Sequence, residues 1–205
     1  TTAFGRGNQR YGTHVFNTHQ DLEDLPTGWG GYDKFPLRSK YYLGEGYQIC
    51  AMSGKFHTSW GEFGGFKHPD AIKFEAASMI AFGSVCNFGD QLHPTGLMDP
   101  QTYRNIGEAM AYVEQIEAYG PGGEPYSNLG LWFTGNTQAD IGVSKMLLER
   151  QIDFVVARED NLAELQTVIL PSGPCLSESQ ASRLKQYVVE GGSLLVLSTG
   201  AMDCG

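Results

Sequence analysis

The sequence predicts an α/β fold with parallel strands, arranged as two units joined by a short linker. Short apolar runs alternate with amphipathic segments of helical period, and long polar loops follow the first strands. Alternating strands and helices place the strands in parallel, because a helix carries the chain back between them. The stretch GPGGEPYSN at residues 120–128 is rich in Gly and Pro. We therefore expect a first domain at 1–120, a linker at 121–128 and a second domain at 129–205.

The first unit begins with two short apolar runs, each followed by a long loop. Residues 12–18 (GTHVFNT) predict a strand, and the acidic and aromatic segment 19–36 predicts the loop after it. Residues 47–52 (YQICAM) predict the second strand, followed by the glycine-rich loop 53–68. Loops after parallel strands meet at one edge of a sheet, so we expect function there.

Two helices and a third strand complete the first unit. Pro69 and Asp70 suit a first helical turn, and Gly83 suits a C-terminal cap. Residues 84–88 (SVCNF) predict a strand. Asp99 predicts the N-cap of the next helix, which closes near Gly120. The apolar side chains expected on one face of that helix are Tyr103, Ile106, Met110, Val113 and Ile116.

The second unit repeats strands and helices with a different spacing. Four apolar runs predict strands at 129–135, 152–157, 167–172 and 193–199. The two amphipathic segments 138–151 and 177–192 predict helices, and Ser177 suits an N-cap. Four apolar strands with two helices correspond to half of a doubly wound parallel sheet.

Charge and composition exclude several kinds of partner. The 205 residues carry a formal net charge of −9, which disfavours nucleic acid and anionic membranes because these require clustered Lys and Arg. No apolar stretch reaches the length of a membrane span. The 4 cysteines are scattered and indicate free thiols, and we expect no metal and no cofactor. The protein is expected to be soluble; its compartment stays open, with a slight preference for the cytoplasm.

Loop 53–68 carries the first candidate site residues. A carboxylate beside an aromatic ring suits cleavage of a glycosidic bond, because the carboxylate acts at the anomeric carbon while the ring stacks on the sugar. Glu62, two residues from Trp60, meets this requirement and is the first candidate catalytic residue. Lys55 and His57 are candidate substrate contacts. In the alternative interpretation Glu62 only ties its loop to backbone amides or pairs with Lys55.

The loop after the third strand supplies the second candidate set. Asp90 is the second candidate catalytic residue, as an acid, a base or a charge stabiliser. Gln91 and His93 are candidates for hydrogen bonds to sugar hydroxyls. The alternative is structural: Asp90 caps the following turn and His93 satisfies a backbone carbonyl.

Loop 19–36 and Cys175 carry the remaining candidate residues. In loop 19–36 we expect Glu23, Trp29 and Tyr32 to contribute to the wall of a substrate pocket. Cys175 raises the hypothesis of an amidotransferase-like nucleophile. The surrounding PSGPCLSES does not match the strained strand-to-helix turn that such a nucleophile needs, so we expect the thiol to pack.

Several segments together resemble a known group of carbohydrate-active enzymes. The segments LPTGWGGYDKFP, MSGKFHTSWGEFGGFKHPDAIKFEAASMIAFG and CNFGDQLHPTGLMDPQTYRNIGEAMAYVEQIEAYG look like the C-terminal part of a glycoside hydrolase barrel. That group is described as hypothetical glycosyl hydrolases with an α-amylase-like or α-L-fucosidase-like barrel. The remainder, with ILPS and LSESQASRLKQYVVEGGSLLVLSTG, is similar to the β-galactosidase trimerisation domain.

This resemblance implies both a fold and a function. The fold is the last strands of a (β/α)8 TIM-type barrel, followed by a flavodoxin-like domain of the class I glutamine-amidotransferase type without its catalytic residues. The function is hydrolysis of a glycosidic bond in an oligosaccharide or glycoside by a homo-oligomer, a trimer or a dimer. The alternative is a carbohydrate-binding or oligomerisation module that does not cleave. Because barrel glycosidases place one essential carboxylate on an earlier strand, we expect this chain to be a fragment of a longer protein.

Overall fold

A computed structural model describes residues 17–25, 31–134, 137–174 and 176–197. The described residues form two compact units, one ending at Gly123 and the other beginning at Glu124. This division falls inside the stretch GPGGEPYSN. Each unit contains one parallel sheet.

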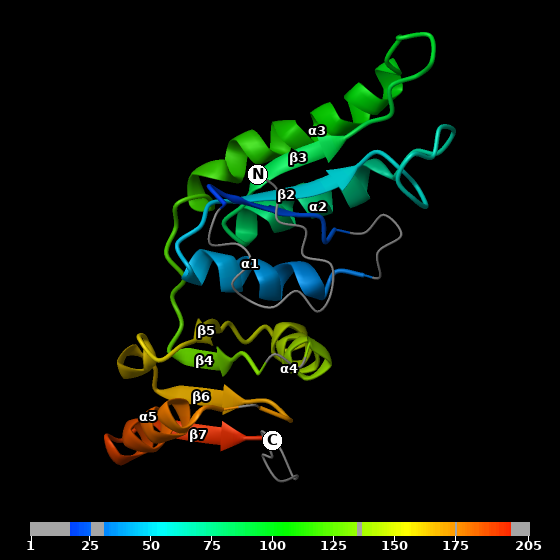
Figure 1. The fold of residues 1–205 in the computed structure, drawn as a ribbon. Coiled ribbons are helices and arrows are strands. Elements are labelled where there is room, and N and C mark those ends of the chain that lie inside the picture. The colour runs from blue at the N-terminus through cyan, green and yellow to red at the C-terminus, as the bar shows by residue number, and fades with distance from the viewer. Residues whose placement is uncertain (1–16, 26–30, 135–136, 175, 198–205) are drawn as a thin grey trace. The chain divides into compact units, whose positions relative to one another are not determined.

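The first unit is a parallel sheet of three strands in the order β1-β2-β3, with a helix after each strand (Figure 1). Its elements are β1 (Gln20–Leu22), α1 (Lys34–Gly44), β2 (Ile49–Gly54), α2 (Pro69–Ala81), β3 (Val85–Gly89), α3 (Pro100–Ile116) and the 3-10 turn η2 (Glu117–Tyr119). β2 is central and pairs with both neighbours.

Helices cover one face of this sheet, and no helix or strand of the described residues covers the other. The strand residues that face the helices join two apolar clusters, with Leu22, Ile49 and Ala51 in the first and Cys86 and Phe88 packed against both. Alternate residues point to the opposite face because successive strand side chains alternate. The residues of that face are half-buried or exposed: Asp21, Cys50, Met52, Val85 and Asn87.

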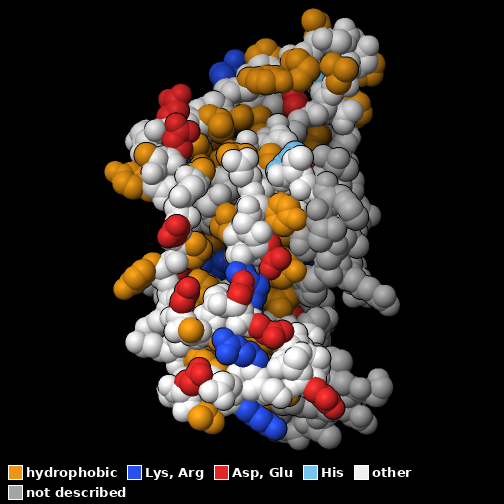
Figure 2. Space-filling model, turned by 60° about the vertical axis from the view of Figure 1, so that its left-hand side comes forward, with side chains coloured by type: hydrophobic (Ala, Val, Ile, Leu, Met, Phe, Trp, Pro, Cys, Tyr) orange, Lys and Arg blue, Asp and Glu red, His pale blue; other side chains and the backbone are white. Residues whose placement is uncertain are grey.

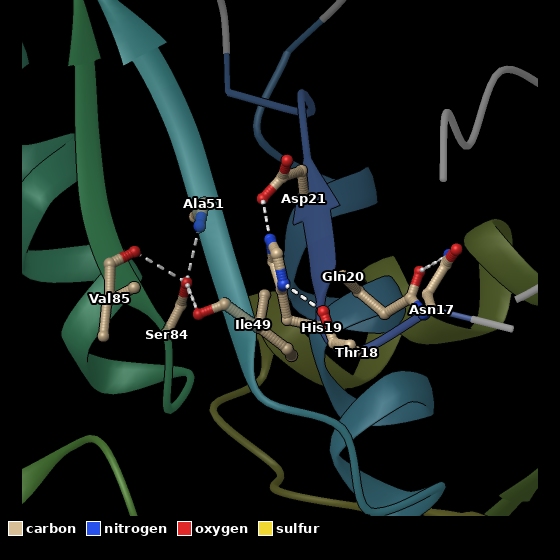
Figure 3. A network of polar contacts seen from close by, with 9 residues as sticks. All are labelled: Asn17, Thr18, His19, Gln20, Asp21, Ile49, Ala51, Ser84 and Val85. Carbon is tan, nitrogen blue, oxygen red and sulfur yellow. Dashed lines mark hydrogen bonds and ion pairs between the residues drawn. The ribbon is translucent and has the colours of Figure 1, made fainter. Parts of the chain in front are cut away.

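A buried serine joins the start of β3 to β2 (Figure 3). The Ser84 hydroxyl accepts a hydrogen bond from the Ala51 amide at 2.7 Å and contacts the Ile49 carbonyl oxygen at 3.1 Å. Ser84 has no exposed surface. Its hydroxyl therefore satisfies backbone groups of β2 that would otherwise be buried without a partner.

The ends of α2 and α3 confirm the sequence prediction. Pro69 occupies the first helical position of α2, and Gly83, with φ of 74°, follows its C-terminal end in the left-handed conformation that favours glycine. At α3, the Asp99 side chain accepts a hydrogen bond from the Gln101 amide at 2.8 Å, as expected for an N-cap.

The beginning of the first unit differs from the prediction. Most of the predicted strand 12–18 lies outside the described residues, and residues 17 and 18 are not in a strand. The described strand is Gln20–Leu22, which lies within the predicted loop. The sequence does not reveal this strand, because two of its three residues are polar and it forms by pairing with β2. Helix α1 begins at Lys34, inside the predicted loop 19–36, and the sequence predicts no helix there. Its Pro36 lies in the first turn, where a proline costs no backbone hydrogen bond.

The predicted face of α3 is confirmed at Val113, which is buried, and at Ile106 and Ile116, which pack against the same cluster, but it is wrong at two positions. Tyr103 and Met110 are exposed. The buried residues are Thr102, Asn105, Ala109 and Val113. Ala109 packs in one cluster with Ala76 of α2, because small side chains let two helices approach closely.

The second unit is a parallel sheet of four strands in the order β5-β4-β6-β7, as the sequence predicts for residues 129–200 as far as these are described. Its elements are β4 (Leu129–Trp132), α4 (Thr137–Glu149), β5 (Val155–Ala157), the 3-10 turn η3 (Leu162–Glu164), β6 (Thr167–Leu170), α5 (Glu178–Val189) and β7 (Ser193–Val196). Ser177 is the N-cap of α5 in a complete capping box with Gln180.

Both faces of this sheet are buried at its centre. Leu184 and Tyr187 of α5 pack on one face, in a cluster with Trp132 and Val168. The Tyr187 ring also lies against Gly192, where an added Cβ would come within 2.2 Å of the ring. Strand residues that point to the opposite face, Leu131 and Ile169 among them, are buried as well.

Among the helices of the described ranges, none is both long enough and apolar enough to cross a membrane.

Replacement of Ser84 by alanine is expected to destabilise the first unit. The Ala51 amide and the Ile49 carbonyl would lose a buried partner, which costs about 1–3 kcal/mol. Denaturant unfolding measures this cost, with Ser59→Ala as a control because Ser59 is exposed in the same unit. Equal unfolding free energies for the two variants would contradict this role of Ser84.

Candidate functional site

The carboxyl ends of β2 and β3 lie side by side and send two loops from the same end of the sheet (Figure 1). Gly54 pairs with Gly89 at the last position of the ladder, and the Lys55 amide donates to the Gly89 carbonyl at 3.0 Å. The ladder thus continues one residue beyond the strands. In a parallel sheet, loops at this edge commonly carry the functional residues.

Three contacts join the loop after β2 to the segment after β3. The Trp60 ring lies against Gly89 so closely that an added Cβ would stand 2.4 Å from it. A Cβ on Gly61 would stand 3.7 Å from the Gln91 side-chain oxygen. The Phe63 and His93 rings meet edge to face at 5.4 Å. The two loops therefore form one structural unit that brings together most of the sequence-predicted site residues.

Glu62 is held by its own loop. Its carboxylate accepts hydrogen bonds from the Thr58 amide at 2.8 Å and from the Thr58 hydroxyl at 2.9 Å. Backbone and side-chain hydrogen bonds from Thr58 lower the pKa of Glu62, because they stabilise its charged form. The carboxylate also lies against Gly65, where a Cβ would come within 2.6 Å of it. These contacts support the alternative in which Glu62 ties its loop.

Asp90 offers an oxygen without a partner. Its Oδ1 accepts a hydrogen bond from the Gln91 amide at 2.7 Å. Its Oδ2 is buried and has no hydrogen-bond partner among the described residues. A buried carboxylate oxygen is costly to leave unsatisfied, so a ligand hydroxyl or a water molecule is the expected partner.

Lys55 and His57 occupy different environments. Lys55 is buried, its Nζ donates to the Phe63 carbonyl at 3.1 Å, and it lies over the rings of Phe56 and Phe66. Its ammonium therefore acts inside the loop, and it does not pair with Glu62, whose carboxylate bonds to Thr58 instead. His57 is exposed in the same loop.

The structure reveals a buried polar network that the sequence prediction missed. Lys67 and Glu75 form an ion pair at 2.8 Å, and Ser53 donates a hydrogen bond to Glu75. Tyr32 reaches the same carboxylate through its hydroxyl at 3.2 Å. Burial raises the pKa of Tyr32 to about 12, with a further contribution from the charge of Glu75. The available signal was Glu75 itself, a charged residue on the apolar face shared by Ile72 and Ala76.

The segment after β1 places another buried carboxylate near its strand end. Asp24 accepts a hydrogen bond from Arg38 at 2.6 Å, while its Oδ2 has no partner among the described residues. Burial raises the pKa of Asp24 despite the opposing effect of Arg38. Glu23 is half-buried beside it, and Trp29 lies outside the described residues.

The uncovered sheet face carries polar contacts of its own. His19 Nε2 lies 3.4 Å from Asp21 Oδ1, and the other His19 ring nitrogen contacts Thr18 (Figure 3). Burial is the largest cause that raises the pKa of Cys50, and nearby Asp21 adds to it. A raised pKa keeps this thiol protonated and unreactive at neutral pH.

Metal-site geometry does not occur in the described part of the chain: no group of three His, Cys, Asp or Glu side chains is placed to hold an ion. Cys50 and Cys86 are free thiols, as predicted. Cys175 and Cys204 lie outside the described residues.

The fold of this chain is found in part of a known enzyme. Among solved structures, it is similar to alpha-L-fucosidase isoenzyme 2 from Paenibacillus thiaminolyticus, with a TM-score of 0.81 and 37% sequence identity. The similarity covers 88% of this chain but only 29% of the fucosidase chain. The chain is thus related by structure to part of a glycoside hydrolase, as the sequence resemblance implies at this level.

No model of a protein family matches the chain, and no curated protein sequence matches it either.

Replacement of Gly89 by alanine is expected to displace the Trp60 ring, because the new methyl group would overlap it. Tryptophan fluorescence measures the change, and Trp60→Phe identifies the contribution of this residue to the emission. Gly64→Ala is the control, since nothing lies within 4 Å of its added Cβ. The same emission spectrum for Gly89→Ala and the parent protein would contradict the contact.

Replacement of Thr58 by valine is expected to raise the pKa of Glu62 toward its ordinary value of 4.5, because the hydroxyl donor is lost. Because the pKa is lowered, the ionised Glu62 carboxylate stabilises the folded loop fully above pH 4.5. This stabilisation is lost as the pH falls through the lowered pKa and the carboxylate becomes protonated. Titration of the Glu62 carboxyl carbon by NMR measures the shift. Thr58→Ser keeps the donor and should titrate like the parent, so identical curves for all three proteins would exclude this role of the hydroxyl.

Proposed function

We propose that this chain is part of a glycoside hydrolase that cleaves an α-L-fucosidic bond at the carboxyl ends of β2 and β3. The observation that carries the proposal is the similarity to part of an alpha-L-fucosidase, at 37% identity over 88% of this chain. Its site geometry agrees with the proposal, because two carboxylates and a tryptophan lie on two loops that contact each other.

Asp90 and Glu62 have different environments and so suit different roles. Asp90 keeps one buried oxygen without a partner, which suits a hydrogen bond to substrate or proton transfer. Glu62 has a lowered pKa and stays ionised, which suits a nucleophile or a stabiliser of positive charge rather than a general acid. Glycoside hydrolysis requires two such carboxyl groups with opposite tasks.

The neighbouring side chains supply candidate contacts to the sugar. Gln91 and His93 lie beside Asp90 and offer hydrogen-bonding atoms, and Trp60 offers an apolar ring surface. Lys55 contributes by holding the loop, because its ammonium donates to the Phe63 carbonyl. The Tyr32 hydroxyl donates its proton to Glu75, so its oxygen can still accept a hydrogen bond from a substrate hydroxyl.

A second candidate function is carbohydrate binding without cleavage. One observation favours it: Glu62 directs its Oε2 atom to Thr58 within its own loop. If Glu62 only holds its loop, Asp90 lacks the second carboxyl group that glycoside hydrolysis requires. Turnover separates the two functions, because a binding module would retain sugar affinity and show no hydrolysis.

The sheet of the first unit suits a place in the wall of a (β/α) barrel. Among the described residues its helices pack on one face only, whereas the other face carries Asp21 and Asn87 and an exposed Val85. A parallel sheet is ordinarily covered on both faces. Further strands that curve around the uncovered face would bury Val85 and place the loops at the barrel mouth.

The second unit is proposed to serve assembly, as the similarity to a trimerisation domain implies, in a homodimer or homotrimer. Several of its apolar side chains are exposed on α5, on β7 and directly after β7, namely Val188, Val189, Leu195, Val196 and Leu197. β7 is also the last strand of the described sheet, and such edges pair readily with other chains. On the face drawn in Figure 2, Asp and Glu side chains lie beside Lys and Arg.

The protein that contains this chain is expected to hydrolyse 4-nitrophenyl α-L-fucopyranoside, and Asp90→Asn should lower kcat by about 10²–10⁴-fold because it removes proton transfer. The released nitrophenolate measures the rate. Asp70→Asn is the matched control, because this carboxylate is exposed in the first turn of α2. Full activity of Asp90→Asn, or no hydrolysis by the parent protein, would contradict the proposal.

Replacement of both Val189 and Leu195 by lysine is expected to lower the oligomeric state measured by light scattering, because two charges would enter an apolar contact. Lys185→Glu, an exposed change on the same helix, is the control. A parent protein that is already monomeric would exclude the assembly role.

A further inference from the structure

The buried pair Lys67 and Glu75 lies where the loop after β2 returns to helix α2. We propose that this pair positions loop 55–67, holding it in the conformation in which Trp60 covers Gly89. Lys67 and Glu75 are then positioning residues of the site. The kinetic part of this inference rests on the proposed hydrolysis, whereas its structural part does not.

Loop 55–67 is closed at its base by backbone hydrogen bonds. The Lys67 amide donates to the Lys55 carbonyl at 2.7 Å, so the two ends of the loop are joined. The Lys55 amide donates in turn to the Gly89 carbonyl at 3.0 Å. A change in the backbone of Lys67 would therefore be transmitted to the base of the loop and to the end of β3.

The Lys67 side chain fixes that base from within the protein. Only 6% of Lys67 is exposed, and its ammonium donates to Glu75 Oε1 at 3.0 Å, Glu75 Oε2 at 2.8 Å and Ser53 Oγ at 2.9 Å. Lysine has three donor hydrogens, so its capacity is filled. Ser53 belongs to β2 and Glu75 to α2, so the ammonium ties the loop to a strand and a helix together.

Stability alone does not account for this arrangement. Removing two charges from water is costly, and a well-packed apolar pair is often as stable as a buried ion pair or more so. An apolar pair, however, has no preferred direction, whereas hydrogen bonds fix where the Lys67 ammonium lies. What Lys67 and Glu75 provide beyond an apolar pair is therefore the position of the loop base.

The second buried lysine supports the interior of the same loop. Lys55 is 2% exposed, donates to the Phe63 carbonyl at 3.1 Å, and lies 5.2 Å from the centre of the Phe66 ring. Lys55 thus holds the far side of the loop while Lys67 holds its base. With both in place, Trp60 and Phe63 keep their contacts to Gly89 and His93.

Amide hydrogen exchange of the whole protein tests the positioning role in two variants. Glu75→Gln leaves Lys67 charged and weakly paired, and the double variant Lys67→Met with Glu75→Leu replaces the pair by apolar side chains. In both, exchange of amides 56–66 should accelerate by about tenfold or more, because loop opening no longer breaks an intact pair. Exchange in α3 should stay unchanged in the double variant, whose unfolding temperature should match the parent. Lys145→Gln, which removes an exposed ion pair, should change neither.

The double variant decides the outcome even if Glu75→Gln fails to fold. Parent-like exchange at 56–66 in the double variant would overturn the inference, because apolar packing would then position the loop equally well. In an active protein, kcat of the double variant should fall by about tenfold or more with a smaller change in KM, since misplaced groups slow the chemical step. If the parent hydrolyses no glycoside, the proposed function is wrong. The exchange experiment still tests the positioning of loop 55–67, because it does not depend on activity.

Discussion

The hydrogen bond from the Lys55 amide to the Gly89 carbonyl is the constraint on which the candidate site depends. It extends the β2–β3 ladder past the last paired residues and so begins both loops at a fixed separation. Trp60 can then cover Gly89 only because that position has no side chain. Asp90 follows Gly89 directly in the chain, and its Oδ1 accepts a hydrogen bond from the Gln91 amide.

Polar groups buried behind the sheet support this arrangement. Glu75, Lys67 and Ser53 form hydrogen bonds with one another, and Ser84 bonds to the backbone of β2 at its other end. In the described part of the first unit, two buried carboxylate oxygens have no hydrogen-bond partner, Asp24 Oδ2 and Asp90 Oδ2. Both follow strand ends. Unsatisfied groups at such positions are expected where a ligand supplies the missing hydrogen bond.

The sequence predicts elements well where local signals agree. Pro69, Gly83, Asp99 and Ser177 mark helix ends that the structure confirms, because capping depends on neighbouring residues alone. The sequence does not predict elements whose structure depends on pairing or packing with distant residues. Gln20–Leu22 is a strand only through β2.

In the candidate site too, the sequence predicts what depends on the order of elements and misses what depends on contacts between distant side chains. Placing Glu62 and Asp90 on adjacent loops requires only the parallel order of the strands, which alternation of elements predicts. The pairing of Lys67 with Glu75 joins a loop to a helix through side chains, and no local pattern encodes it. Helix period alone places Glu75 on a buried face, and a buried carboxylate requires a partner.

The central claim is that the carboxyl ends of β2 and β3 bind a sugar. A crystal structure of the protein that contains this chain, with L-fucose bound, tests it most directly. We expect a sugar hydroxyl within hydrogen-bonding distance of Asp90 Oδ2, with Trp60 still covering Gly89. Fucose bound elsewhere, with Asp90 Oδ2 satisfied by a protein group or left without a partner, would contradict the claim.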